Sequence, residues 1–137
     1  MEDQAGELRF ATFRLARRLR AERADDGMSD AQFMVLAALR REGEQTLGRL
    51  AERERVSAPS MNRTVNCLEE AGYVARRTDD VDRRRVYIAA TAKGAELVVE
   101  TVRRRDAWLN AALGIFTTDE QELLAAATPL LRRLAEE

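Results

Sequence analysis

The chain has 137 residues and a formal net charge of −1 at pH 7, and 45% of its residues are hydrophobic and 34% charged. This length fits one domain with its own core, the single cysteine excludes an intrachain disulfide framework, and no apolar run approaches the length of a membrane span. The acidic first segment lacks the hydrophobic stretch of a secretory signal, so we expect a cytoplasmic protein.

Residues 7–23 are predicted to form a helix that is apolar on two sides. One stripe recurs at helical spacing and consists of Leu8, Ala11, Leu15 and Leu19. Phe10 and Phe13 fall outside this stripe, on a second side. A helix with two apolar sides usually lies between two partners, and in a chain this short we expect the second partner to be another copy.

Two short helices are predicted next, each with a recognisable start. Ser29 and Gln32 have the spacing of a capping box ahead of a helix over residues 30–41. A second helix is expected over residues 46–56, with Thr46 at its N-cap.

The helix predicted over residues 57–71 has an apolar side and a polar side. Ser57 suits its N-cap, Pro59 suits its first turn, and Gly72 ends it. The apolar side, which we expect to pack inward, consists of Met61, Val65 and Leu68. The side that must then face outward consists of Ser60, Asn62, Arg63 and Asn66.

Residues 73–78 and 85–90 are predicted to be strands joined by a charged loop. Helix, turn, helix and a hairpin with a basic tip form a winged helix-turn-helix. Arg84 is expected at the tip of this wing, and Asp79 or Asp82 is expected to pair with a neighbouring arginine and stiffen the loop. The alternative is that these are ordinary solvated charges of a hairpin.

A long helix is predicted after the wing, beginning at a Thr91 cap and continuing to about residue 112. It contains the run 103–105, which is three arginines. Such a run is usually a solvated face, and we expect that here.

Thr118 and Gln121 are predicted to form a second capping box, which opens the last helix. Pro129 lies inside this helix, lacks a backbone N–H and is expected to kink or split it.

Charge is segregated along the chain. Residues 73–94 carry six basic and three acidic side chains, whereas residues 113–137 carry two basic and five acidic ones. This pattern is typical of a protein that faces phosphate with one side only, and the polar side of the helix over residues 57–71 fits the major groove of DNA. The predicted DNA-binding residues are Ser57, Ser60, Asn62, Arg63, Asn66, Arg83, Arg84 and Arg85.

The residue types suggest separate roles within this set. Asparagine can pair bidentately with adenine, and arginine can contact guanine or a phosphate. We expect Arg84, at the tip of the wing, to reach the minor groove, where narrow A·T tracts attract guanidinium groups.

Several segments together carry a resemblance to a known family: Ser29–Gln32, Thr46–Ala51, Val56–Val74, and Asp82–Arg84 followed by Thr91–Gly94. On these segments the chain resembles the MarR (multiple antibiotic resistance regulator) family over residues 8–135. The most specific piece is the Asp-x-Arg of the wing ahead of a Leu-Thr-x-x-Gly motif. This chain has Ala90 where the leucine is expected, which predicts looser packing at the base of the wing.

The resemblance implies a mainly α (α+β) fold in which residues 1–137 form a single domain. A winged helix-turn-helix over residues 29–91 would be flanked by dimerisation helices over residues 7–23 and 92–135. It implies a homodimer that binds a pseudopalindromic operator in double-stranded DNA through two recognition helices. It further implies transcriptional control, usually repression, which a small aromatic or anionic effector relieves. We expect no cofactor.

The effector-binding residues are the least specified by the sequence. Candidates for an aromatic cavity with a cation are Phe10, Phe13, Arg17, Phe33 and Arg40. The alternative is that they are ordinary core and surface residues. Cys67 is expected to be a buried or bystander thiol, with a redox switch as the alternative.

Other function classes predict different behaviour. An enzyme is not expected, because the chain has no histidine and nothing that resembles a glycine-rich phosphate loop or a nucleophile elbow. A winged helix used for protein–protein contact would bind no DNA. A sequence-tolerant architectural protein would bind random duplex almost as well as any operator.

Overall fold

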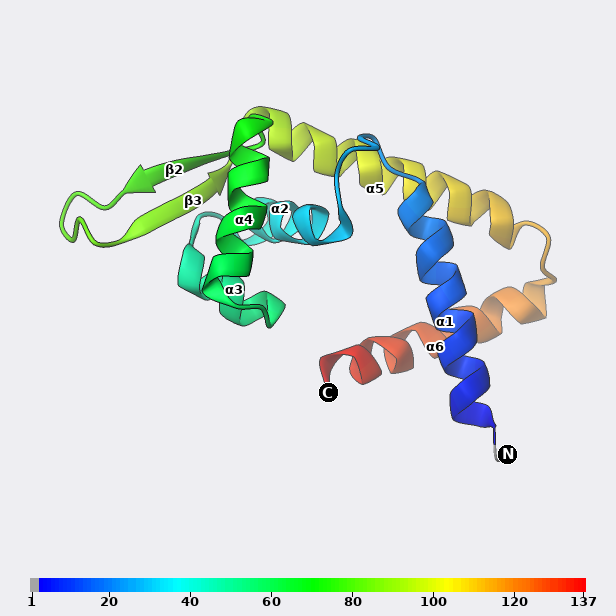
Figure 1. The fold of residues 1–137 in the computed structure, drawn as a ribbon. Helices are drawn as coiled ribbons and strands as arrows, with labels where there is room; N and C mark the ends of the chain where they lie inside the picture. The colour runs from blue at the N-terminus through cyan, green and yellow to red at the C-terminus, as the bar shows by residue number, and fades with distance from the viewer. Residues whose placement is uncertain (1–2) are drawn as a thin grey trace.

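The wing and the long helix that follows it set the shape of the molecule. The structure is a computed structural model that describes residues 3–137. The elements in chain order are α1 (Gln4–Ala21), α2 (Asp30–Glu42), β1 (Gln45–Thr46), α3 (Leu47–Glu54), α4 (Ala58–Glu70), β2 (Val74–Thr78), β3 (Val86–Ala90), α5 (Ala92–Leu113) and α6 (Thr118–Glu136). Figure 1 shows a lobe of α2, α3 and α4 with the wing projecting from it, and α5 leading from this lobe to α1 and α6. The predicted winged helix-turn-helix is confirmed.

The core lies within the lobe that carries the wing. Leu36 of α2, Leu50 of α3, Val65 of α4 and Ile88 of β3 are each almost completely buried. Burying an aliphatic side chain of this size stabilises the folded state by roughly 1.5–3 kcal/mol. This packing fixes α4 against the other two helices and leaves its opposite side exposed.

Side-chain caps begin the helices of this lobe where the sequence predicts them. Ser29 and Gln32 form the reciprocal capping box of α2. The hydroxyl groups of Thr46 and Ser57 accept the N–H groups of Arg49 and Ser60 at the starts of α3 and α4. The three predicted helix starts are therefore confirmed.

The sheet has the strand order β1-β3-β2 and is antiparallel. The register of the wing pairs Val74 with Ala90 and Thr78 with Val86. The sequence did not predict β1, because two residues that pair with Tyr87 and Ile88 are too short for any alternation to be visible. Ala90 is partly buried and packs against the core at the base of the wing.

The start of α5 is held tightly against the end of α4. Thr91 caps α5 by accepting the Gly94 N–H, and its own hydroxyl donates to the Gly72 carbonyl. A Cβ on Gly94 would lie 2.2 Å from the Tyr73 carbonyl oxygen, so only glycine allows this approach. The orientation of α5 is therefore fixed by its first turn.

The C-terminal helix differs from two predictions. Its capping box is formed by Thr117 and Glu120, one residue earlier than the predicted Thr118 and Gln121. Gln121 instead donates its side-chain amide to the Leu113 carbonyl. Pro129 does not split the helix, which is continuous from Thr118 to Glu136.

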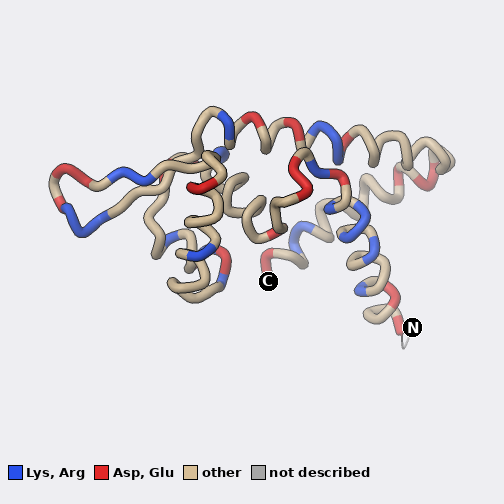
Figure 2. Tube along the Cα trace, turned by 45° about the horizontal axis from the view of Figure 1, so that its top comes forward, with Lys and Arg blue, Asp and Glu red and all other residues tan. Residues whose placement is uncertain are grey.

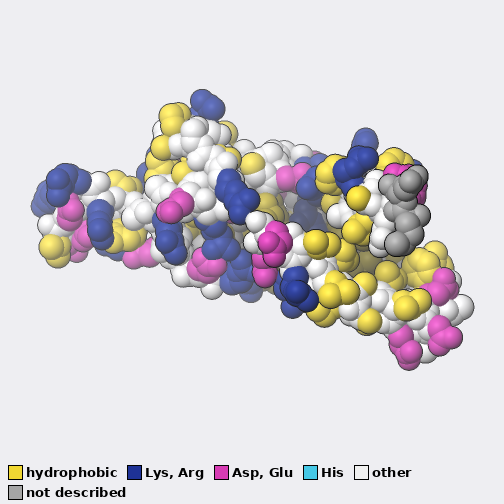
Figure 3. All heavy atoms as spheres, turned by 90° about the horizontal axis from the view of Figure 1, so that it is seen from below, with side chains coloured by type: hydrophobic (Ala, Val, Ile, Leu, Met, Phe, Trp, Pro, Cys, Tyr) yellow, Lys and Arg dark blue, Asp and Glu magenta, His cyan; other side chains and the backbone are white. Residues whose placement is uncertain are grey.

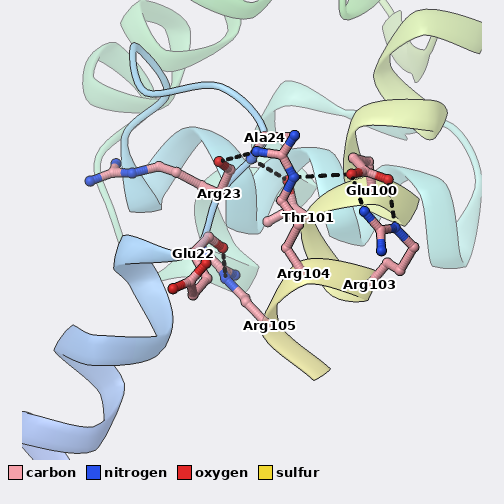
Figure 4. Close-up of polar contacts among 8 residues, drawn as sticks. All are labelled: Glu22, Arg23, Ala24, Glu100, Thr101, Arg103, Arg104 and Arg105. Atoms are coloured by element: carbon pink, nitrogen blue, oxygen red, sulfur yellow. Dashed lines mark hydrogen bonds and ion pairs between the residues drawn. The ribbon is translucent and has the colours of Figure 1, made fainter. Parts of the chain in front are cut away.

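The arginine run of α5 is the predicted solvated face only in part: Arg103 and Arg104 are exposed, whereas Arg105 is not (Figure 4). Arg105 is partly buried, donates to the carbonyls of Leu19 and Glu22, and stacks on the Phe33 ring at 4.4 Å. Arg104 donates to the Arg23 carbonyl. These carbonyls lie at the C-terminal end of α1, where cations are favoured, so the run attaches α1 to α5.

Glu100 organises the exposed part of the same run. It accepts hydrogen bonds from Arg103 and Arg104, and these bonds lower the pKa of its carboxyl from 4.5 to about 2. Arg103 and Arg104 are both exposed and pair with Glu100, as expected of surface charges.

The helices α1 and α6 are incompletely covered in a single chain. No residue of either helix is buried. Their exposed large apolar side chains are Leu8, Phe10, Phe13, Leu15, Leu123, Leu124, Leu130, Leu131 and Leu134. Within residues 3–137, no helix combines the length and the apolar character needed to cross a membrane.

Candidate nucleic-acid interface

The turn between α3 and α4 sets the angle of the second helix. Arg55 ends α3 in the left-handed conformation, with φ 55° and ψ 44°. Its N–H bonds to the carbonyls of Ala51 and Glu52, and the Val56 N–H bonds to the Ala51 carbonyl. Two helices joined by such a short turn form the helix-turn-helix unit, with α4 as its second helix.

The polar side of α4 is exposed as predicted, except at one position. Asn62, Arg63 and Asn66 are exposed, and so is Ser57 at the N-cap. Ser60 is partly buried; its N–H bonds to the Ser57 hydroxyl, and its carbonyl accepts the Thr64 hydroxyl. Ser60 therefore shapes the first turn and projects less than its neighbours.

An arginine that the sequence did not single out lies against this polar side. Arg76 of β2 donates from Nη2 to Oδ1 of Asn62 at 3.1 Å and to Oδ1 of Asn66 at 2.8 Å. Its Nη1 donates to Glu69 at 3.2 Å. The alternation of β2 was the available signal, because Val74, two residues earlier on the same face, is buried.

The tip of the wing is stiffened by the predicted aspartate–arginine pair. Asp82 Oδ1 accepts both the backbone N–H and the Nε of Arg84 at 3.1 Å. These bonds hold the pKa of the Asp82 carboxyl below its ordinary value of 3.8. The Arg84 side chain is nevertheless 93% exposed, and Arg83 and Arg85 are also exposed.

The root of the wing is held by residues outside the predicted set. Arg77 donates to both carboxylate oxygens of Glu44, at 2.7 and 3.3 Å, and lies over the Tyr87 ring at 4.9 Å. These bonds connect β2 to the segment between α2 and β1. An open groove of about 670 Å³ lies beside them, between the wing and the start of α3, lined by residues 44–49 and 84–87.

Basic side chains gather on this part of the molecule. Within residues 3–137, the arginines of the lobe and wing that form no ion pair are Arg40, Arg49, Arg55, Arg63, Arg83 and Arg85. Figure 2 shows the basic segments along the wing, beside an acidic stretch at its tip. In Figure 3, basic side chains are spread over the wing and lobe, whereas apolar side chains gather near α1 and α6.

The candidate effector-binding residues do not meet in one cavity of the single chain. Phe10 and Arg17 line an open depression on α1. Phe33 lines a separate pocket of about 10 Å³ beside Arg105. Phe13 and Arg40 are exposed and line neither. Cys67 is exposed on α4 as a free thiol.

Comparisons with known proteins identify this arrangement. The model of the MarR family matches residues 26–85. An HTH-type transcriptional regulator of Mycobacterium leprae is 38% identical over 133 residues, which cover 97% of this chain and 93% of the relative. The chain belongs to the MarR family. It is a DNA-binding transcriptional regulator.

Two further similar proteins have names that concern regulation. The transcriptional repressor MdtR of Bacillus subtilis is 29% identical over 110 residues, which cover 80% of this chain and 71% of the relative. The structure of BpsR of Bordetella bronchiseptica has a TM-score of 0.72 and 27% identity, and covers 96% of this chain and 98% of its own. That structure concerns regulation of DNA binding by 6-hydroxynicotinic acid.

Proposed function

We propose that the protein is a homodimeric repressor that binds a pseudopalindromic operator. Each subunit places α4 in a major groove, and the two recognition helices lie about 34 Å apart, one turn of the duplex. The observation that carries this proposal is the exposed polar side of α4, with Arg63 at its centre, beside the basic wing.

The DNA-contacting residues in this proposal are Ser57, Ser60, Asn62, Arg63, Asn66, Arg83, Arg84 and Arg85. Arg63 is available for a guanine edge or a phosphate. Arg84 extends from a stiffened loop and enters the minor groove, where its guanidinium is attracted by the negative potential of A·T tracts.

The proposed dimer covers the apolar sides of the terminal helices. In the proposed division of the chain, residues 29–91 read DNA and residues 7–23 and 92–135 hold the two copies together, within one domain. A second copy that covers the apolar side chains of α1 and α6 would stabilise the dimer by roughly 25 cal/mol for each Å² of apolar surface removed from water. The proposed compartment is the cytoplasm.

Two similar proteins support relief of repression by a small aromatic or anionic molecule. MdtR is named a repressor, and the DNA binding of BpsR is regulated by 6-hydroxynicotinic acid, which is an aromatic acid. A site built from Phe10, Phe13, Arg17, Phe33 and Arg40 would need the second subunit, because these residues lie apart in one chain. A thermal-shift screen with small aromatic acids tests it, and no rise in melting temperature would exclude these ligands.

Selection of bound duplexes from a random pool tests the main proposal. We expect a consensus with two-fold symmetry and an affinity that falls steeply with salt, with a slope of log K against log salt of about −7 if eight phosphates are neutralised. Binding of random duplex with equal affinity would instead indicate an architectural protein. Absence of salt-dependent DNA binding would indicate a protein-contact module.

The wing assignment has a charge-matched control. Arg84→Ala should weaken binding and reduce the salt slope by about 1. Arg103→Ala removes the same charge from α5, away from the wing, and should leave both quantities unchanged. An unchanged affinity and slope for Arg84→Ala would show that the wing arginine does not contact DNA.

A further inference from the structure

Arg76 occupies a position from which it controls the polar side of α4. It lies opposite Ile88 in the wing register, and side chains of directly opposed residues share a face of the sheet. Ile88 is almost completely buried, so Arg76 starts on the side of β2 that faces the core and reaches across to α4. It is not one of the freely projecting wing arginines.

The guanidinium binds three residues that form a single stripe of α4. Asn62, Asn66 and Glu69 are separated by four and three residues, so they lie above one another on the helix. Glu69 holds one end of the guanidinium at 3.2 Å and compensates its charge. The other end is then fixed between the two asparagines, which accept at 3.1 and 2.8 Å.

This arrangement determines which way both carboxamides face. In a carboxamide the carbonyl oxygen and the NH₂ group diverge from the same trigonal carbon, so the two groups point in different directions. Because the oxygen of each asparagine is turned toward Arg76, its NH₂ group is turned away from β2. The exposed polar side of α4 therefore offers hydrogen-bond donors at positions 62 and 66.

We propose that Arg76 is a specificity-determining positioning residue, which makes Asn62 and Asn66 select base edges rich in acceptors. Guanine presents two adjacent acceptors, O6 and N7, in the major groove, whereas a bidentate asparagine–adenine contact needs one donor and one acceptor. Because the Oδ1 atoms of Asn62 and Asn66 are bound to Arg76, these residues favour guanine over adenine at the base pairs that they contact. This inference rests on the proposed entry of α4 into the major groove.

The experiment compares consensus operators selected from random duplexes by the wild-type homodimer and by Arg76→Met. In the wild type, the positions that Asn62→Ala and Asn66→Ala alter should carry guanine. In Arg76→Met the amides are free to turn, so adenine should appear there, and the guanine-to-adenine preference measured on defined duplexes should fall about tenfold.

Arg77→Met is the matched control. It removes the same group from the next residue of β2, which faces the other side of the strand and binds Glu44 instead. It should leave the consensus unchanged, whatever it does to overall affinity. If Arg76→Met were unstable, Arg76→Gln, which retains part of the stem and one amide, should change the preference in the same direction.

A double variant separates positioning from a direct role. If Arg76 acts through the asparagines, Arg76→Met added to an Asn62→Ala, Asn66→Ala background should not change the base preference further. An Arg76→Met protein that weakens on all sequences equally and keeps the wild-type consensus would overturn the inference while leaving the proposed function intact. A wild-type protein that selects no consensus would overturn both.

Discussion

Arg55 is the only residue other than glycine with a positive φ among residues 3–137. Most L residues pay about 1–2 kcal/mol in this conformation, because the Cβ approaches the carbonyl oxygen. Here the turn that positions α4 requires it, and the bonds from the Arg55 N–H keep it in place. The helix-turn-helix thus contains local strain that a substitution can remove.

Arg55→Gly should therefore raise the free energy of unfolding by about 0.5–1 kcal/mol, since the relieved strain exceeds the extra entropy of glycine in the unfolded chain. Urea-induced unfolding measures it. Gly43→Ala is the converse control: Gly43 has φ 84° and nothing within 4 Å of an added Cβ, so the loss of stability expected there comes from the backbone alone. A stability loss in Arg55→Gly would show that the arginine side chain matters more than the strain.

Tyr73 and Asp25 form a residue-scale link that depends on pH. The Tyr73 hydroxyl donates to Asp25 at 2.7 Å, and this bond, together with the Gly27 N–H, lowers the pKa of the Asp25 carboxyl below 3.8. A carboxyl with a lowered pKa in the folded state contributes stability above its unfolded pKa. That contribution is lost as pH falls through the folded value.

Tyr73→Phe should accordingly destabilise the protein by about 1 kcal/mol at pH 7 and by less near pH 3, which is below the ordinary carboxyl pKa of 3.8 that Asp25 regains in the unfolded chain. Unfolding in urea at the two pH values measures the difference. Tyr87→Phe removes a tyrosine hydroxyl from the wing, away from Asp25, and should show no such change over this range. A deficit that is the same at both pH values would argue against the linkage.

At the scale of elements, the parts that could be predicted are those whose signal is local. The caps at Ser29, Thr46, Ser57 and Thr91 are confirmed because a cap is a contact over three residues. The capping box of α6 was placed one residue late because Thr117 and Thr118 both have a suitable partner three residues on.

The features that could not be predicted depend on partners far away in the chain. Arg105 binds carbonyls 83 and 86 residues earlier, so its own neighbours give no sign that it is partly buried. Arg77 likewise finds Glu44 from another element, 33 residues distant. The predicted solvated face is confirmed for Arg103 and Arg104, which are exposed, and is wrong for Arg105, which is partly buried.

Arg105→Ala should loosen the C-terminal end of α1. Loss of two bonds to helix carbonyls and of the stacking on Phe33 should lower stability by about 1–3 kcal/mol. Hydrogen exchange of peptides that cover residues 16–24 should become faster than exchange in α4. Arg103→Ala, which removes an exposed ion pair that contributes little to stability, is the control. Unchanged exchange in these peptides would show that α1 is held by other contacts.

At the scale of the whole molecule, the apolar sides of α1 and α6 predict an obligate association. Leu130→Glu places a charge where the proposed second copy packs, and Leu130 is 56% exposed in the single chain. The variant should sediment as a monomer at micromolar concentration and lose operator affinity by at least tenfold, since each subunit then contacts only one half-site. Circular dichroism shows whether the helices persist.

Val81→Glu is the control for the measured molecular mass. It also replaces an exposed apolar side chain with a charge, but Val81 lies at the tip of the wing, where it is 95% exposed. It should leave the molecular mass unchanged. A dimeric Leu130→Glu protein, or a monomeric wild type, would show that the copies do not meet through α6.

The segment between α1 and α2 is bound from several directions at once. The Ala24 N–H bonds to Thr101, the Arg23 carbonyl accepts Arg104, and Asp25 accepts Tyr73, next to the end of α4. These contacts join α1 and α5 to the end of α4, so the terminal helices and α4 move as one unit. In the proposed dimer this rigidity fixes the distance between the two recognition helices. The affinity for an operator with one base pair inserted between its half-sites should therefore be lower, because neither subunit can reorient to follow the displaced half-site.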